Sequence, residues 1–439
     1  MAGWNRIAQS MLLAYDDKAT KDVPLDVHRI RAHELHGKLV FDGFAIAWTC
    51  IGSTVGRDCI FIGYVCRRRY GEPAEPPLCS PRHATGETMV TNIKRLVYFE
   101  EFMDPIAAQI LSACPEIELV RLEYASPVDD NWAEMSRTLG YQTQSRVELR
   151  EPWFANANMV AHCPNLLAVA STGAGYDMVD VGDCTKAGVI VVNQSGTNKE
   201  GVAEHALGLM LALSKKIATS DRAMRIVPDL VRRNYQGNDI KGKILGIVGI
   251  GNIGTRLSDI CRAAFGMTIL AYDPYLTAEQ VAARGGTQVG LEELMRRSDY
   301  VSVHCPRTKE SYGMLGAAQF AAMKPSAYFI NTARGGIHDE PALAEALRKG
   351  QLAGAGLDVF LQEPPPLDHP LLAMDNVIVS PHNAGMTDES ILEMVTATAH
   401  QWIGIFEGRV PPRLVNPEAW PLYAKRFAEI VGHAPDALS

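Results

Sequence analysis

The fold class is decided by one stretch of the sequence, Ile244-Leu245-Gly246-Ile247-Val248-Gly249-Ile250-Gly251-Asn252-Ile253-Gly254. Its first five residues form a largely apolar run typical of a buried strand, and the next three glycines have the spacing of a dinucleotide-binding turn. Gly249 would permit a tight turn, Gly251 would let the backbone approach a pyrophosphate, and Gly254 would let helix and strand pack closely. The free N–H groups at the start of the following helix would face the phosphates. The stretch therefore predicts a Rossmann domain that binds a dinucleotide.

An acidic residue further along the chain indicates which dinucleotide is bound. Asp273 follows the apolar run 268–272 and stands 19 residues after Gly254, where Rossmann domains place the residue that binds the adenosine ribose. A carboxylate there accepts hydrogen bonds from the ribose hydroxyls and would repel a 2′-phosphate, so we predict NAD rather than NADP as the cofactor. The alternative is a fortuitous glycine turn with an unrelated surface aspartate.

Strands and helices alternate on both sides of this stretch. Downstream, short apolar runs predict further strands over 268–272, 300–304, 327–330, 354–358 and 377–380. Upstream, similar runs predict strands over 94–99, 117–122, 166–170 and 189–192, with helices over 105–114 and 132–139. A long helix over about 199–225, with apolar residues at three- and four-residue steps, would link the two series. This alternation predicts an α/β protein with doubly wound parallel sheets.

Composition excludes several classes of protein. The 439 residues, 47% of them hydrophobic, suffice for two or three domains. The net charge of -8 provides no positive field for a nucleic acid. The nine cysteines, without a C-x-x-C pair, favour reduced thiols over disulfides or a zinc site. Because residues 1–16 lack a signal-peptide pattern and the apolar stretch 44–66 contains Arg57 and Asp58, we expect a cytoplasmic protein without a membrane span or a metal.

Residues 1–88 differ from the rest of the chain in amino-acid composition and in hydrophobic pattern. Four of the nine cysteines lie there, together with the cluster Arg67-Arg68-Arg69 and a proline-rich run over 73–81. No repeated helix or strand pattern is visible in this region, whereas a regular pattern begins after Met89. We interpret residues 1–88 as an N-terminal extension, either disordered or a misassigned start, that the following domains do not need.

Several segments stand in an order that is characteristic of one enzyme family. They are Ser171-Thr172-Gly173-Ala174-Gly175-Tyr176-Asp177, Val202-Ala203-Glu204-His205, the glycine turn, Asn331-Thr332-Ala333-Arg334-Gly335-Gly336, Leu357-Asp358-Val359-Phe360, Glu363-Pro364 and Ser380-Pro381-His382. Through them the chain, over about 89–417, resembles the NAD-dependent D-isomer-specific 2-hydroxyacid dehydrogenases.

The resemblance implies two domains with an active-site cleft between them, in a homodimer. A flavodoxin-like substrate domain would comprise residues 89–194 plus 383–417, and a Rossmann NAD-binding domain would comprise 195–382. Residues 418–439 would then form a C-terminal tail.

The resemblance implies that Arg334, Glu363 and His382 are catalytic, and the chemistry of each side chain agrees. Interconversion of a 2-oxo acid and a 2-hydroxy acid moves a hydride at C2 and a proton at the oxygen, and His382 can exchange that proton near neutral pH. A carboxylate at Glu363 would favour the protonated imidazole and hold one ring nitrogen. The guanidinium of Arg334 can bind the substrate carboxylate and polarise the carbonyl. Taken singly, each has a structural alternative: a helix-capping arginine, a loop carboxylate and a buried histidine.

The resemblance also implies roles for residues around this trio. Ala174, Gly175 and Asn198 would bind substrate with Arg334, and the glycine loop could present backbone N–H groups to a carboxylate unless it is a simple turn. Thr332 and Ala333 would line the nicotinamide, and Asp358 would hold its carboxamide. The full set of implied cofactor-binding residues is Gly249, Gly251, Asn252, Ile253, Gly254, Asp273, Thr332, Ala333 and Asp358.

Two positions narrow the expected substrate. Ser171 stands where the phosphoglycerate dehydrogenases of this family commonly have an arginine, and Glu363 stands where the formate dehydrogenases have a glutamine. We therefore expect a small 2-oxo acid that carries no phosphate, and we do not expect formate. Some relatives are NAD-sensing transcriptional corepressors that keep the same trio, so a binding protein of the same fold is the alternative function.

Overall fold

The computed structural model describes residues 36–41, 44–51, 60–67, 93–145 and 148–438, and the chain divides into two units, 1–80 and 81–439. In the first unit, β1 (His36–Phe41), β2 (Phe44–Ile51) and β3 (Ile60–Arg67) form an antiparallel sheet in that order. These segments are strands, although no strand pattern was visible in the sequence of residues 1–88. Because β2 is apolar at almost every position, no alternation of period two marks it in the sequence. The remainder of the predicted extension up to residue 88 lies outside the described residues.

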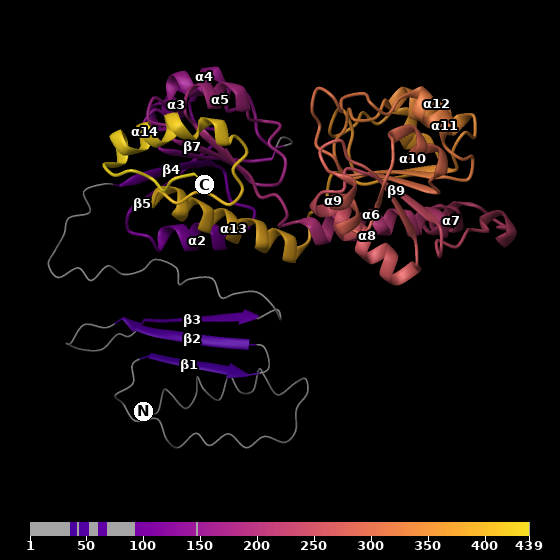
Figure 1. The fold of residues 1–439 in the computed structure, drawn as a ribbon, viewed down its shortest axis with the longest axis horizontal. Helices are drawn as coiled ribbons and strands as arrows, with labels where there is room; N and C mark the ends of the chain where they lie inside the picture. The colour runs from indigo at the N-terminus through magenta and orange to yellow at the C-terminus, as the bar shows by residue number, and fades with distance from the viewer. Residues whose placement is uncertain (1–35, 42–43, 52–59, 68–92, 146–147, 439) are drawn as a thin grey trace, which may run out of the picture. The chain divides into compact units, whose positions relative to one another are not determined.

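The second unit begins with a five-stranded parallel sheet (Figure 1), which lies in the domain expected to bind substrate and is called the substrate domain below. Its strands are β4 (Lys94–Phe99), β5 (Ile117–Leu122), β6 (Gly140–Thr143), β7 (Ala168–Ser171) and β8 (Ile190–Val192). Its helices before the NAD-binding domain are α2 (Ile106–Ser112), α3 (Val128–Met135), α4 (Ala157–His162) and α5 (Val181–Lys186). The spatial order β5-β4-β6-β7-β8 is the flavodoxin-like order that the resemblance implied.

Strands β7 and β8 of this sheet are buried on both faces. Val169 packs in a cluster on one face, while its neighbours Ala168 and Ala170 pack in a cluster on the other. Successive side chains of a strand point to opposite faces, so a strand covered on both sides must be apolar throughout. This explains why β7 and β8 appear in the sequence as short runs of small or apolar residues.

A seven-stranded parallel sheet forms the NAD-binding domain, in the order β11-β10-β9-β12-β13-β14-β15. The strands are β9 (Ile244–Val248), β10 (Thr268–Tyr272), β11 (Thr287–Gln288), β12 (Tyr300–Val303), β13 (Tyr328–Asn331), β14 (Gly354–Leu357) and β15 (Val377–Val379). The helices of this domain are α6 (Lys199–Ser214), α7 (Ile217–Ile226), α8 (Asn252–Phe265), α9 (Ala278–Ala283), α10 (Leu291–Arg297), α11 (Ala317–Ala322) and α12 (Glu340–Arg348). The order reverses between β9 and β12, and ligands bind beyond the carboxyl ends of strands at such a switch point.

The end of the chain returns to the substrate domain. Helix α13 (Asp388–Phe406) packs on α2, and α14 (Trp420–Val431) adds Trp420, Tyr423 and Phe427 to the same hydrophobic core. Figure 1 shows α13 and α14, in gold and yellow, alongside the first sheet of this unit. The expectation of a C-terminal tail over 418–439 is therefore wrong, because these large apolar side chains recur at helical spacing and are buried.

Two helix predictions need correction. The helix expected over 199–225 is interrupted at Lys216, whose φ of 53° places it in the left-handed region, and it continues as α7. The helix expected over 132–139 lies four residues earlier at its start, and the unpredicted strand β6 follows it. Within the described part of the chain, no helix combines the length and the apolar character that a membrane span requires.

Candidate active site

The glycine turn after β9 has the space that a dinucleotide requires. A Cβ on Gly249, whose φ is 88°, would lie 2.7 Å from the backbone nitrogen of Cys305, and a Cβ on Gly254 would lie 2.4 Å from the carbonyl oxygen of Gly249. A Cβ on Gly251 would meet nothing within 4 Å. The first and third glycines are therefore needed for packing, whereas the second borders open space. Helix α8 begins there without a side-chain cap on Gly251, which leaves its amino end available to phosphates.

Asp273 lies beside this turn, as the sequence predicted. Its carboxylate accepts hydrogen bonds from the backbone N–H of Ile250, at 3.2 Å, and of Tyr275, at 3.1 Å. These bonds hold the carboxylate at the carboxyl end of β10 against the glycine turn. The side chain of Asn252 points elsewhere and donates a hydrogen bond to Ser195 Oγ at 3.2 Å.

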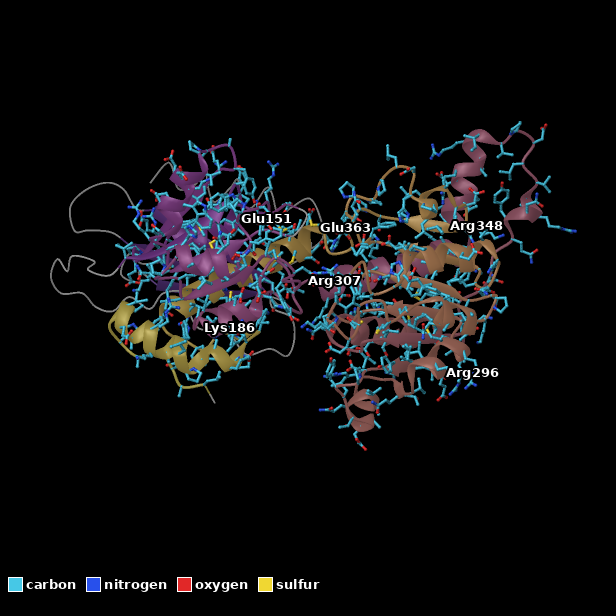
Figure 2. All side chains as sticks on the ribbon, turned by 90° about the horizontal axis from the view of Figure 1, so that it is seen from above. Glu151, Lys186, Arg296, Arg307, Arg348 and Glu363 are labelled. Atoms are coloured by element: carbon cyan, nitrogen blue, oxygen red, sulfur yellow. The ribbon has the colours of Figure 1, made fainter. Side chains whose placement is uncertain are left out.

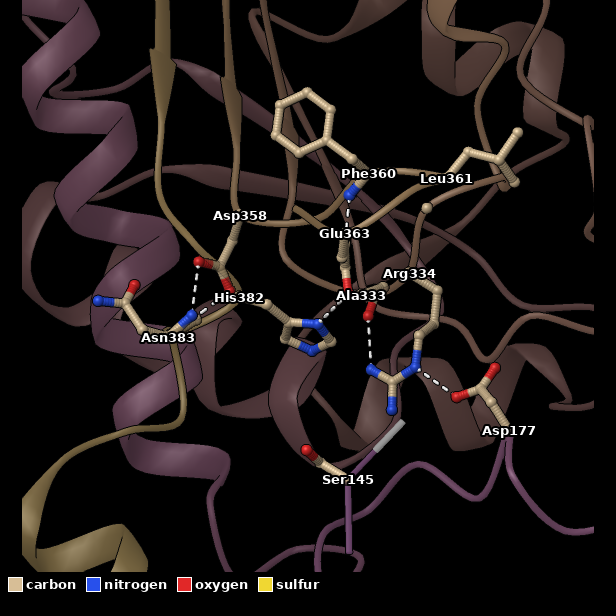
Figure 3. A network of polar contacts seen from close by, with 12 residues as sticks. Ser145, Asp177, Ala333, Arg334, Asp358, Phe360, Leu361, Glu363, His382 and Asn383 are labelled. Carbon is tan, nitrogen blue, oxygen red and sulfur yellow. Dashed lines mark hydrogen bonds and ion pairs between the residues drawn. The ribbon is translucent and has the colours of Figure 1, made fainter. Parts of the chain in front are cut away.

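Glu363 and His382 form the pair that the sequence predicted. His382 Nδ1 lies 2.8 Å from Glu363 Oε2, and Glu363 Oε1 accepts a hydrogen bond from the N–H of Phe360 at 3.0 Å (Figure 3). Their side chains are 33% and 19% exposed, respectively. The imidazole is therefore held at one nitrogen, and its other nitrogen, Nε2, is the one that can meet a ligand.

The surroundings of Glu363 keep it ionised. Burial raises the pKa of this carboxyl, but the hydrogen bond with His382, the charge of His382, the N–H of Phe360 and the charge of Arg334 together lower it more. The net result is a pKa below the usual range for glutamate. A permanent carboxylate at this position stabilises the protonated form of the imidazole that it contacts.

Arg334 reaches across to the glycine loop of the substrate domain. Its Nε donates to Asp177 Oδ2 at 2.8 Å, and its Nη1 donates to the carbonyl of Ala333 at 2.7 Å. A Cβ on Gly175 would lie 1.5 Å from Nη2 of Arg334, so the guanidinium occupies the space above that glycine. Figure 3 shows this guanidinium near the imidazole of His382, with Asp177 on its far side. The structure thus brings Arg334, Glu363 and His382 together.

Asp358 supports the loop that carries His382. Its carboxylate, which is buried, accepts hydrogen bonds from Ser380 Oγ at 2.6 Å and from the N–H groups of Asn383 and Ala384 at 3.0 Å, and its carbonyl accepts from the N–H of His382 at 2.8 Å. His382 has a φ of 56°, a conformation that costs roughly 1–3 kcal/mol for a residue with a side chain. In this structure Asp358 therefore stabilises the strained loop.

Among the other implied ligand-binding residues, some have polar atoms without a hydrogen-bond partner and others are hydrogen-bonded within the protein. The hydroxyl of Thr332 and Oδ1 of Asn198 are buried without a hydrogen-bond partner among the described residues, which is the condition of groups that await a ligand or a water. Ala333 is fixed by its N–H, which donates to Asn331 Oδ1 at 2.9 Å. The carbonyl of Ala174 accepts from Asn193 Nδ2 at 2.8 Å, so this loop is pinned through its carbonyl oxygen.

Two charged residues of the site were not predicted from the sequence. Arg307 donates to Asp177 Oδ1 at 2.9 Å and to the carbonyl of Gly335 at 3.2 Å. Figure 2 shows Arg307 and Glu363 at the edge of the NAD-binding domain that faces the substrate domain, whereas Arg296 and Arg348 lie elsewhere on it. Asp177 stood within a recognised motif, and Arg307 follows the carboxyl end of β12, where ligand-binding residues are expected.

Comparison with known proteins agrees with this geometry. The family model described as D-isomer specific 2-hydroxyacid dehydrogenase, NAD binding domain, matches residues 207–384. A glyoxylate reductase of Korarchaeum cryptofilum is 40% identical over 266 residues, which cover 60% of this chain and 80% of that protein. A D-3-phosphoglycerate dehydrogenase of Archaeoglobus fulgidus is 37% identical over 270 residues, or 62% of this chain, and the match spans only 51% of that longer protein.

A solved structure extends the similarity beyond the NAD-binding domain. The holo form of Rhodotorula graminis D-mandelate dehydrogenase superposes with a TM-score of 0.67 at 28% sequence identity. The superposition covers 74% of this chain and 98% of that one. Both sheets of the second unit therefore have counterparts in a complete relative, and the expected fold class is confirmed. The chain belongs to the D-isomer-specific 2-hydroxyacid dehydrogenase family and contains that family's NAD-binding domain.

Proposed function

We propose that the protein reduces a small 2-oxo acid to the D-2-hydroxy acid with NADH, and catalyses the reverse reaction with NAD. The observation that carries this proposal is the 2.8 Å contact between His382 and Glu363 beside the guanidinium of Arg334. A proton donor, a carboxylate that stabilises its charged form and a cation for an anionic substrate are the groups that this reaction needs.

The residues around the glycine turn fit NAD. The open space over Gly251 and the uncapped start of α8 suit the pyrophosphate, and Asp273 suits the ribose hydroxyls. The unpartnered hydroxyl of Thr332 and the backbone of Ala333 would meet the nicotinamide side. The carboxylate of Asp358 already accepts hydrogen bonds from the loop that carries His382, so it would bind the carboxamide through its remaining lone pairs. When bound, the reduced cofactor supplies the hydride for C2 of the substrate.

His382 would move the proton. In reduction, its Nε2–H donates to the carbonyl oxygen of the substrate as the hydride reaches C2, and the neutral imidazole remains hydrogen-bonded to Glu363 through Nδ1. In oxidation, the neutral imidazole accepts the proton of the hydroxyl. Because Glu363 stays ionised, the imidazolium is stabilised whenever it forms.

Arg334 would bind and polarise the substrate. Its guanidinium retains N–H groups on Nη1 and Nη2 that can meet the substrate carboxylate and the carbonyl oxygen. Gly175 lies against this guanidinium, and the backbone N–H groups of Gly175 and of its neighbour Ala174 would bind the same carboxylate. Asn198, at the amino end of α6, would complete this side of the site with its unpartnered Oδ1.

Two residues narrow the class of substrate that we propose. Ser171 is buried and donates its hydroxyl to the carbonyl of Gly175, so it offers no cation at the position that carries an arginine in the phosphoglycerate branch. Glu363, paired with His382, suits a reaction that exchanges a proton, whereas formate oxidation exchanges none. We therefore place substrates such as glyoxylate, hydroxypyruvate or pyruvate ahead of phosphorylated acids and formate.

The experiment that tests this function is oxidation of NADH, followed by absorbance, with glyoxylate, hydroxypyruvate, pyruvate and phenylpyruvate. We expect turnover with at least one acid, and NADPH should be a poorer donor than NADH. Absence of turnover with every acid, while NADH still binds, would contradict the proposal and favour the NAD-sensing binding protein.

We also propose that the protein is a homodimer. On α7 and just after it, Met224 and Ile226 are 75% and 79% exposed, and Val231 is 58% exposed. Exposed apolar side chains that gather on one element are typical of protein–protein interfaces. Size-exclusion chromatography with light scattering should give twice the mass of the chain, and Met224→Glu with Ile226→Glu should give the monomer; a monomeric wild type would contradict the proposal.

We propose in addition that residues 1–88 are dispensable for activity. The residues that form the candidate site all lie between 171 and 385, in the second unit. A chain that begins at Met89 should keep its turnover number and its affinity for NADH, and an inactive or insoluble product would contradict this.

A further inference from the structure

The carboxylate of Asp177 lies between two guanidinium groups of the NAD-binding domain. Arg334 donates to one of its oxygens at 2.8 Å and Arg307 to the other at 2.9 Å. The side chain of Asp177 is only 14% exposed, so these bonds form with little competition from water. Hydrogen bonds between charged partners in partly buried surroundings are among the strongest in proteins.

These contacts fix the orientation of Arg334. Its Nε is committed to Asp177, and its Nη1 is committed in part to the carbonyl of Ala333. An arginine has five N–H donors, so one on Nη1 and two on Nη2 remain, and these lie along one edge of the guanidinium. Figure 3 places Asp177 on the side of the guanidinium away from His382. The remaining N–H of Nη1 is thus on the side of the imidazole, whereas Nη2 lies against Gly175.

The loop that carries Asp177 is shaped to receive the guanidinium. Any side chain at Gly175 would collide with it, because a Cβ there would lie 1.5 Å from Nη2. Two residues later, Asp177 accepts from Nε of the same side chain. The glycine and the aspartate of this motif therefore serve one purpose, which is to seat an arginine from the other domain.

Charge explains the presence of Arg307. A lone aspartate beside Arg334 would cancel its positive charge and weaken its attraction for an anionic substrate. With Arg307 on the second oxygen, the group of three carries a net charge of about +1. Arg307 also donates to the carbonyl of Gly335, the residue after Arg334, which ties the two arginine loops together.

We propose that Asp177 is a positioning residue, which orients Arg334 for the carboxylate of the substrate while Arg307 compensates its charge. This role rests on the proposed function, because it concerns the substrate of that reaction, but it can be tested by measuring ligand binding without turnover. Oxalate, a small dianion that resembles a 2-oxo acid, is the probe for the enzyme–NADH complex.

The test uses Asp177→Ala, Asp177→Asn and the double variant Asp177→Ala with Arg307→Gln in the full-length chain. Asp177→Ala should weaken oxalate binding and raise the KM of the 2-oxo acid by about tenfold or more, as expected for the loss of a charged hydrogen bond. Asp177→Asn keeps one acceptor for Nε and should lose less. The Kd of NADH should stay within about twofold of the wild-type value, because the glycine turn is untouched.

The double variant separates orientation from charge. It restores the net charge of the group to about +1 but supplies no acceptor for Arg334, so it should remain about tenfold weaker than wild type in oxalate binding. The control is Asp129→Asn, which removes an exposed carboxylate from α3 of the same domain and should bind oxalate normally.

Wild-type affinity for oxalate in either Asp177→Ala or the double variant would overturn the inference. Turnover of 2-oxo acids by the wild type is measured separately, so an inactive wild type would refute the proposed function without deciding the role of Asp177. Oxalate binding decides that role, and a wild-type complex that does not bind oxalate would overturn the inference as well.

Discussion

Replacing Glu363 with glutamine removes one negative charge from the partner of His382 and keeps the shape of the side chain. The two groups are joined at 2.8 Å between Nδ1 and Oε2. Unit charges about 4 Å apart interact with about 4 kcal/mol at an effective dielectric constant near 20. Since the side chain of His382 is one-third exposed, solvent screens this pair, and the charge interaction that the variant loses is about 1.4–2.7 kcal/mol.

The sign of the effect follows from which form of the imidazole each direction needs. Reduction requires the imidazolium, which the carboxylate stabilises and the amide does not. The alkaline fall of the reduction rate in Glu363→Gln should therefore move to lower pH. Oxidation requires the neutral imidazole, so its acidic limb should move to lower pH as well. The assay is kcat/KM against pH in both directions, with the Kd of NADH measured alongside.

A second glutamate–histidine pair provides a matched control. Glu340 Oε2 lies 3.1 Å from His369 Nε2, and Glu340 Oε1 accepts from the N–H of Leu361, in the same loop that carries Glu363. Glu340→Gln should disturb this loop to a similar extent but leave the pH limbs in place. Limbs that do not move in Glu363→Gln, or that move equally in both variants, would refute the proposed role of Glu363.

Three further predictions concern the cofactor site and the stability of the fold. Asp273→Ala should raise the preference for NADP relative to NAD by about tenfold, since a charge repulsion of about 1.4 kcal/mol is removed; an unchanged ratio of kcat/KM for the two cofactors would contradict this. Gly254→Ala should lower the free energy of unfolding by about 1–3 kcal/mol, because the new Cβ would lie 2.4 Å from a carbonyl oxygen, whereas Gly251→Ala should keep the wild-type stability and weaken NADH binding. Thermal denaturation and NADH titration check both variants, and a Gly251→Ala protein that is less stable than Gly254→Ala would contradict the argument. Burial lowers the pKa of His304 to about 3 and that of His338 to about 4. Between about pH 6.5 and pH 4 the unfolded chain therefore binds protons that the folded chain does not, and the free energy of unfolding should fall by up to about 2.7 kcal/mol per pH unit as the pH is lowered. In urea unfolding, His338→Gln should show about half that change per pH unit, and an unaltered pH dependence would count against the argument.

Regular elements with a strong local signal could be predicted from the sequence. Strands β4, β5, β9 and β10 have the predicted bounds. In β9 the signal is a continuous apolar run that is buried along almost its whole length, whereas β5 is mostly half-buried or exposed and carries Glu118 and Arg121. The break at Lys216 could not be predicted, since no glycine or proline marks it and the residue adopts a left-handed conformation. Helix α14 could have been found from the spacing of Trp420, Tyr423 and Phe427, had the region not been assigned to a tail.

The candidate site shows the same division between local and distant information. The tasks of Gly251 and Gly254 follow from a motif of a few residues, and the structure gives each the surroundings that its task requires. The bond between Asp177 and Arg334 joins residues that are 157 positions apart and belong to different domains. Such a contact depends on how two separately folded sheets meet, and neither periodicity nor local motif carries that information.

The central claim is that His382 exchanges the proton of the reaction, and the variant His382→Ala tests it most directly. The measurement is the turnover number with the best 2-oxo acid in the panel, together with the Kd of NADH from the quenching of its fluorescence. The account predicts a loss of turnover of about a hundredfold or more, with NADH binding within about twofold of wild type. Near-normal turnover in His382→Ala would contradict it.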